Sequence, residues 1–248
     1  MQRLNKLHFF RFEFKYVFNK RLRDEVEREL QYFMELDPFV KDKPDYRYFV
    51  RSLYFDDPFF SAYYDKIDGL HTRSKFRLRT YTKNIGSPVP LFFEIKGRYN
   101  NLVFKHRVLC NLNEQHTSMG GMRLAQKMAC ILDPTPIAEQ FRYEFYRKRL
   151  EPVVLVDYWR RPYVSKYNPE FRLTFDEALR ATATSRLFPP ALPPGRSIGP
   201  GFTIMEVKFR YHIPSWFHRI IQHFELQRVS ISKVCKGIEA CGLAKNLE

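Results

Sequence analysis

Five short segments of this sequence alternate between charged and apolar residues, and this alternation constrains the fold more than any other feature. They are Arg11–Tyr16, Lys75–Arg79, Phe93–Arg98, Phe104–Val108 and Met205–Arg210. Because successive strand residues point to opposite faces of a sheet, each segment predicts a strand with one apolar and one charged face. The charged faces carry mostly Lys and Arg, with a single Glu in each of three segments. Such a face cannot pack on an apolar layer, so it must lie in water or surround an anion.

Three more segments, rich in β-branched and aromatic residues, are further strand candidates: Tyr48–Phe55, Val153–Trp159 and Phe171–Phe175. Helical patterns occupy 20–36, 121–132 and 214–227. The prediction is an α+β fold, an eight-stranded antiparallel sheet with helices packed outside. If the sheet closes into a barrel, the charged faces line a tunnel with room for one small ligand.

The chain length fits one domain over residues 1–248. The stretch 185–200 carries five prolines and two glycines, which predicts an irregular loop inside that domain. The sequence that follows it is too short to fold alone. A second loop, at 83–90, is typical of a hairpin connection.

The chain carries 42 Lys and Arg against 27 Asp and Glu, a net charge of +15, which attracts polyanions. A binder of single-stranded nucleic acid would place exposed aromatic rings among its cations, whereas here Phe and Tyr fall on the opposite face. No specific nucleic acid is therefore expected. A compact anion such as a triphosphate would neutralise a cationic tunnel, and a Glu beside it could hold Mg²⁺ or Mn²⁺.

The four cysteines show no zinc-ligand spacing, and the charged N-terminus does not read as a secretion signal. No apolar run is long enough to predict a transmembrane segment. We therefore expect reduced thiols and a cytoplasmic location. Asp176 follows a predicted strand, where it could reach a tunnel mouth or cap a helix over Glu177–Arg180.

Several motifs occur together and in a recognisable order: RFEFKYV, KFRLRTY, FFEIKGR, VFKHR, IMEVKFR and VSISKVCKG. In these stretches the chain resembles the catalytic, polyphosphate polymerase domain of the vacuolar transporter chaperone (VTC) family, within the triphosphate tunnel metalloenzymes. The resemblance implies a tunnel: a closed barrel of eight antiparallel strands with helices packed outside, which transfers phosphoryl groups. Its implied partners are ATP, triphosphate or polyphosphate, and its implied cofactor is Mn²⁺ or Mg²⁺.

The resemblance also implies roles for particular residues, position by position. Catalytic, phosphate-binding cations are expected at Lys15, Arg77, Arg79, Lys96, Lys105, Arg107 and Lys233. Further substrate-binding cations are expected at Arg11, Arg161, Arg172 and Lys208, with the register near Arg161 open by one residue. The implied metal ligands are Glu206, supported by Glu94 and Glu13.

The first-strand motif departs from the superfamily pattern Glu-x-Glu-x-Lys, because it reads Arg11-Phe12-Glu13-Phe14-Lys15. Arg11 makes this motif more basic, as in the polymerase branch of the superfamily. Glu13, in contrast, is acidic at a position that can be basic in that branch. Polyphosphate synthesis from ATP is the favoured function. A triphosphatase, or a module that only binds polyphosphate, inositol phosphates or nucleic acid, is the alternative. A membrane-protein partner stays open, because some family members carry membrane segments.

Overall fold

The computed structural model describes residues 12–84, 90–99, 102–110, 119–131, 135–189 and 195–245. Its strands are β1 (Phe12–Asn19), β2 (Met34–Leu36), β3 (Tyr48–Asp56), β4 (Thr72–Thr80), β5 (Leu91–Tyr99), β6 (Leu102–Cys110), β7 (Glu151–Ser165), β8 (Arg172–Ala183), β9 (Arg196–Ser197) and β10 (Phe202–Phe209). Its α-helices are α1 (Lys20–Leu30), α2 (Ser61–Ile67), α4 (Gly121–Ile131), α5 (Pro136–Lys148), α6 (Ser215–His223) and α7 (Lys233–Cys241). Each of the eight predicted strand segments lies wholly or largely in one of these strands.

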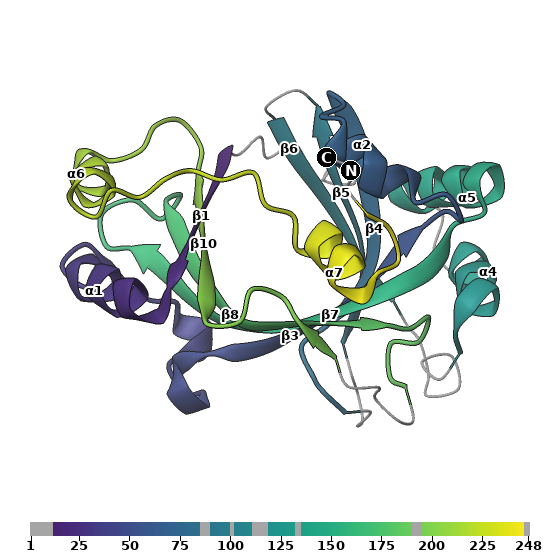
Figure 1. Cartoon of the computed structure of the whole chain (residues 1–248), viewed down its shortest axis with the longest axis horizontal. Helices are drawn as coiled ribbons and strands as arrows, with labels where there is room; N and C mark the ends of the chain where they lie inside the picture. The colour runs from purple at the N-terminus through teal and green to yellow at the C-terminus, as the bar shows by residue number, and fades with distance from the viewer. Residues whose placement is uncertain are drawn as a thin grey trace, which may run out of the picture.

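Eight strands form one antiparallel sheet in the order β1-β10-β8-β7-β3-β4-β5-β6, and β2 and β9 add short edges to β7 and β8. Figure 1 shows this sheet bent into a trough, with β3, β7 and β8 along the bottom and β1 and β6 on opposite sides. The α+β architecture with a large antiparallel sheet is therefore confirmed.

The closed barrel is not observed, because β1 and β6 form no backbone ladder among the described residues. The free edge of β1 instead meets the segment before α7: Tyr16 bridges to Arg228, and the Val229 amide donates to the Lys15 carbonyl at 2.8 Å. A side-chain contact spans the trough, since Lys96 of β5 reaches Glu13 of β1 at 2.8 Å. Alternation along a strand fixes which face is charged, but it does not determine which strand edges meet.

Helices cover the outside of the trough in two groups (Figure 1). On one side α4 and α5 pack on the outer face of the sheet around Phe76, Phe93 and Phe141. On the other side α1 and α6 pack around Phe175 and Phe217. The apolar halves of the alternating strands thus form the outer core, and their charged halves face inward, as the sequence predicts.

The predicted helices are present as α1, α4 and α6, and those predicted at 20–36 and 214–227 are shorter than expected. The pattern at 20–36 yields α1, which begins at the Asn19 cap, where the side chain accepts from the Leu22 amide at 2.9 Å, and ends at Leu30. The residues that follow turn and pair with β7 as β2. Among the described residues no helix is long and apolar enough to cross a membrane.

Helix α7, which the sequence patterns did not predict, lies inside the trough (Figure 1). Its Val234 and Ile238 pack with Val154 and Val156 of β7. Gly237 permits this approach, because a Cβ there would already lie 3.1 Å from the Val156 side chain. The helix fills part of the trough with apolar contacts and leaves a charged cavity beside its N-terminus.

Candidate functional site

The charged inner faces of the strands and the start of α7 enclose a cavity of about 760 Å³. Among the side chains that line it, fourteen are Lys or Arg and three are acidic. Most of the residues expected from the sequence line it: Lys15, Arg77, Arg79, Lys96, Lys105, Arg172, Lys208, Lys233, Glu13 and Glu206. Arg107 and Glu94 adjoin this wall through ion pairs with residues that line it or with each other. Arg11 lies outside the described residues.

Arg161 is the exception, and the structure corrects its expected place. Arg160 shares the inner face of β7 with Tyr158 and lines the cavity, so Arg161 points to the outer face. There it donates to Glu27 of α1 at 2.7 Å. Because Arg160 and Arg161 are adjacent and identical, the sequence alone does not show which of them lies on the inner face of the strand.

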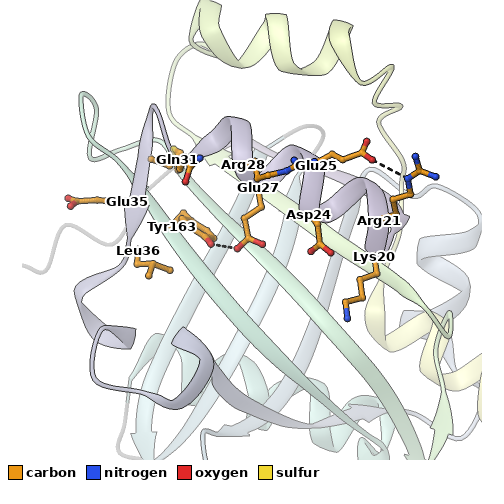
Figure 2. A pocket seen from close by; sticks show the side chains of 11 residues that line it. Lys20, Arg21, Asp24, Glu25, Glu27, Arg28, Gln31, Glu35, Leu36 and Tyr163 are labelled. Carbon is orange, nitrogen blue, oxygen red and sulfur yellow. Dashed lines mark hydrogen bonds and ion pairs between the residues drawn. The ribbon is translucent and has the colours of Figure 1, made fainter.

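Glu27 belongs to a second hollow of about 850 Å³, outside the trough, which Figure 2 shows beside α1 and β2. Tyr163 donates a hydrogen bond to Glu27 there, and Arg21 pairs with Glu25. Acids and bases alternate along this hollow, so it lacks the single sign of charge that distinguishes the cavity. We place the functional site in the cavity.

The first of three groups of ion pairs in the wall joins Asp176 and Glu206. Arg160 donates to both oxygens of Asp176 at 2.6 Å and to Glu206 at 3.0 Å. Lys233 lies 2.6 Å from Asp176 and 2.5 Å from Glu206. All four side chains are nearly inaccessible to solvent. Strand pairing fixes this group, because Asp176 of β8 lies opposite Arg160 of β7.

Electrostatics keep these carboxylates ionised. Burial alone would raise the pKa of Glu206, but Lys233, Lys208 and Arg160 outweigh it and hold the pKa well below its ordinary value. Burial likewise opposes the ionisation of Asp176, and Arg160 and Lys233 lower its pKa. Burial tends to lower the pKa of Lys233, yet the two carboxylates raise it above its usual range. Lys233 therefore stays charged inside the protein.

The second group surrounds Glu94, which is fully buried. Arg77 reaches it at 2.5 Å, Arg107 at 2.6 Å and Lys105 at 2.7 Å. These cations overcome the effect of burial and lower the pKa of Glu94. Arg77 also donates to the Tyr54 hydroxyl at 2.9 Å. Burial would raise the pKa of Tyr54, but Arg77 and Arg79 bring it down to about 8.

The third group is centred on Glu13. Lys96 donates to both of its oxygens, at 2.8 and 3.0 Å, and Lys15 lies 3.2 Å away. Burial raises the pKa of Glu13, but Lys96 and Lys15 prevail and lower it. Burial also lowers the pKa of Lys96, to about 8, against the opposing effect of Glu13. Glu13 is therefore a fixed negative charge in a mainly positive wall.

Cations come to lie opposite cations along β4, β5 and β6. Arg77, Glu94 and Arg107 lie side by side across the three strands, so one acid separates two cations. The next inward-facing row is Lys75, Lys96 and Lys105, and the row after that places Arg73 opposite Arg98. Like charges directly opposite one another on a sheet are destabilising. An anion bound along these rows would remove that repulsion.

The residues that sequence reasoning missed are those whose role depends on a partner across the sheet. Arg160 was hidden by its neighbour Arg161. Asp176 was read as a tunnel-mouth residue or a helix cap, but it is a wholly buried strand residue. Lys75 was visible in the KFRLRTY alternation and could have been included; it donates to the Ser232 hydroxyl at 3.1 Å.

A metal ion held by the protein alone does not fit these contacts. No cluster of three or more His, Cys, Asp or Glu side chains suited to a metal occurs in the part of the chain that the structure describes. Glu94 shares no cation partner with Glu206, so the two acids belong to separate groups. Glu13 and Glu206 are close enough to interact electrostatically, but both are already paired with cations.

Comparison with known proteins identifies the family of this chain. The model of the VTC domain matches residues 10–241, whereas no curated protein sequence matches. A candidate adenylate cyclase from Bacillus halodurans aligns at a TM-score of 0.50 and 13% identity, over 90% of this chain and 94% of that one. A candidate adenylyl cyclase from Hippeastrum, described as having dominant triphosphatase activity, aligns at 0.49 and 10% over 93% and 95%. The Bacillus structure shares the fold, and the match over 10–241 shows that the chain belongs to the VTC-domain family.

Proposed function

We propose that the protein transfers phosphoryl groups from a triphosphate chain inside the cavity, and that its reaction is polyphosphate synthesis from ATP. The observation that carries this proposal is the cavity wall, where Lys and Arg far outnumber acids and buried carboxylates hold several of the cations in place. Membership of the VTC-domain family supports the same reaction class.

The wall residues suit the electrostatics of phosphoryl transfer. Charge on the transferred group spreads over its oxygens, and fixed cations stabilise it without reorganising. Arg77 and Arg79 are oriented by Tyr54, Tyr158 and Ser52 through hydrogen bonds of 2.9 to 3.1 Å. Lys15, Lys96 and Lys208 are partly exposed to the cavity and can exchange a carboxylate partner for a phosphate oxygen.

In the proposed reaction, the bond between the terminal phosphorus of ATP and its bridging oxygen breaks, and ADP leaves with that oxygen. A new bond forms between the phosphorus and a terminal oxygen of an acceptor phosphate chain. If water is the acceptor, the same site releases phosphate, so a triphosphatase is the second candidate. The phosphate chain would bring its divalent cation with it, and Glu206 and Glu13 are the carboxylates that could then share that ion with phosphate oxygens. Bound there, Mn²⁺ or Mg²⁺ would add positive charge at the reacting oxygens.

The first test is incubation of the purified protein with ATP and Mn²⁺ or Mg²⁺, with Glu206→Gln as the matched inactive variant. We expect long-chain polyphosphate from the wild type and at least about a hundredfold less from the variant, as when one preorganised electrostatic group is lost. Free phosphate without polymer would make the protein a triphosphatase. If neither product forms but ATP or polyphosphate still binds, the protein is a module that binds phosphate chains without reaction.

The cation rows predict a dependence on chain length. Lys66 and Arg73 line the cavity beyond the Lys75 row, and no described carboxylate lies within ion-pair distance of either. Burial, and then the charge of Arg73, lowers the pKa of Lys66. We expect the Lys66→Ala/Arg73→Ala variant to bind long-chain polyphosphate about tenfold more weakly, a change of about 1.4 kcal/mol. Its affinity for inorganic triphosphate should change less than about twofold, because a short chain ends before this row.

Isothermal titration with triphosphate and with long-chain polyphosphate measures this difference. The matched control is Lys20→Ala/Arg21→Ala, which removes the same charge from the outer hollow of Figure 2. Equal weakening of the two ligands by the Lys66 variant would contradict a role specific to long chains. If both double variants weakened polyphosphate binding equally, the effect would come from the lower net charge of the protein and not from these two positions.

A further inference from the structure

Lys15 stands between the two carboxylates that a bound divalent cation would need. Its ammonium nitrogen lies 3.2 Å from Glu13 and 3.8 Å from Glu206, and it donates to the Ile231 carbonyl at 3.0 Å. Strand pairing fixes this position, because Lys15 of β1 lies opposite Glu206 of β10. An ammonium group has three N–H donors, and each of these three oxygens is within its reach.

Other cations hold the remaining carboxylate oxygens. Lys96 contacts both oxygens of Glu13, and Lys233 and Arg160 contact the two oxygens of Glu206. A Mg²⁺ ion needs oxygen ligands at about 2.0–2.1 Å in a near-octahedral arrangement. It would have to enter a space already bordered by ammonium and guanidinium groups, and Coulomb repulsion from them would oppose it.

We propose that Lys15 takes the place of a resident divalent cation, so that the free protein binds none and the ion enters only together with a phosphate chain. The phosphate oxygens would draw Lys15 away from Glu13 and Glu206, which removes the ammonium group between the two carboxylates as the ion arrives. The inference rests on the proposed function for the identity of the anion, but its metal-binding test does not. It assigns Lys15 a second role besides contact with phosphate: it keeps the two carboxylates apart from metal until substrate is present.

The test is a titration of Mn²⁺ alone, followed by electron paramagnetic resonance of the free ion. The wild type is expected to leave the signal of free Mn²⁺ unchanged. Lys15→Met, which removes the ammonium group between the two carboxylates, is expected to bind one Mn²⁺ at least about tenfold more tightly than the wild type. Lys15→Met/Glu13→Gln should lose the gained site. Lys208→Met is the matched control, because among the described residues Lys208 forms an ion pair with Glu206 alone, at 3.4 Å, and its removal should gain little.

Binding of Mn²⁺ by the wild type as tight as that by Lys15→Met would overturn the inference, and so would a folded Lys15→Met that gains no site. Circular dichroism shows whether Lys15→Met is folded. If it is not, the inference is tested on the wild type alone, by measuring how far bound Mn²⁺ enhances the relaxation of water protons. Enhancement by Mn²⁺ alone would then refute the inference, and enhancement only after inorganic triphosphate is added would support it. Failure of the protein to bind triphosphate at all would refute the proposed function instead, while the Mn²⁺ titrations of Lys15→Met and wild type could still be compared.

Discussion

Asp176→Asn is expected to lower the free energy of unfolding by about 3–5 kcal/mol, the usual cost of removing one partner from a buried ion pair. Asp176 is completely buried and pairs with both Arg160 and Lys233 at 2.6 Å. An asparagine keeps the size of the side chain but removes its charge and one acceptor. Two buried cations would then share only Glu206 as a close carboxylate.

Urea denaturation followed by circular dichroism measures this loss, with Asp45→Asn as the matched control. Asp45 also pairs with an arginine, Arg47, at 2.8 Å, but its side chain is 64% exposed. Exposed pairs contribute at most about 1 kcal/mol, so the control should unfold almost like the wild type. Similar losses in the two variants would show that Asp176 is not a buried counter-charge. Long-chain polyphosphate should raise the melting temperature of Asp176→Asn more than that of the wild type, because the unpaired cations gain a phosphate partner.

The alternation of charged and apolar residues was sufficient to predict the strands and the inward direction of their charges. A period of two is a property of the strand itself and survives whatever the strand packs against. Lys15, Arg77, Lys96 and Glu206 therefore line the cavity as expected. The same pattern carries no information on closure, because the edge of β1 beside Tyr16 pairs with Arg228, more than 200 residues away.

The errors occurred where local sequence offers two solutions and a distant contact selects one. The residues after Asp176 include good helix formers, but β8 continues through them to Ala183. The register of β8 against β7 shifts near Ala178, whose positive φ of 50° marks the irregularity. Pairing with β7 and β10 outweighs the helical preference, and it carries Asp176 into the interior. Tertiary contacts of this kind commonly override weak local propensities.

The pairing of the carboxylates was equally hidden. Glu13, Glu94 and Glu206 appear in the sequence as isolated acids among cations, which suggests metal ligands. In the structure each is in contact with at least two Lys or Arg side chains, and at least one of these comes from another strand or from α7. Only the positions of β5, β7 and α7 around the trough reveal that these acids already have partners.

Arg160→Lys is expected to lower turnover of ATP about 30- to 100-fold, whereas Arg161→Lys should change it less than twofold. The planar guanidinium of Arg160 binds both oxygens of Asp176 and one of Glu206, and a lysine ammonium cannot reproduce this fork. Loss of bidentate, charge-assisted contacts costs about 2–2.7 kcal/mol, which corresponds to that range of rates. Arg160 acts as a positioning residue here, since it orients Glu206 and lines the cavity wall.

The two variants make the same chemical change at neighbouring positions, so they separate the inner face of β7 from the outer one. Arg161 contacts Glu27 on α1, outside the trough, and lysine can keep that pair. Steady-state kinetics of both variants give kcat and KM, and urea denaturation checks that each is folded at the assay temperature. A fall in kcat for Arg160→Lys with little change in KM would indicate misplacement of the groups that stabilise the transferred phosphoryl. Equal losses in both variants would mean that the cavity is not where the reaction takes place, because only one of the two side chains faces it.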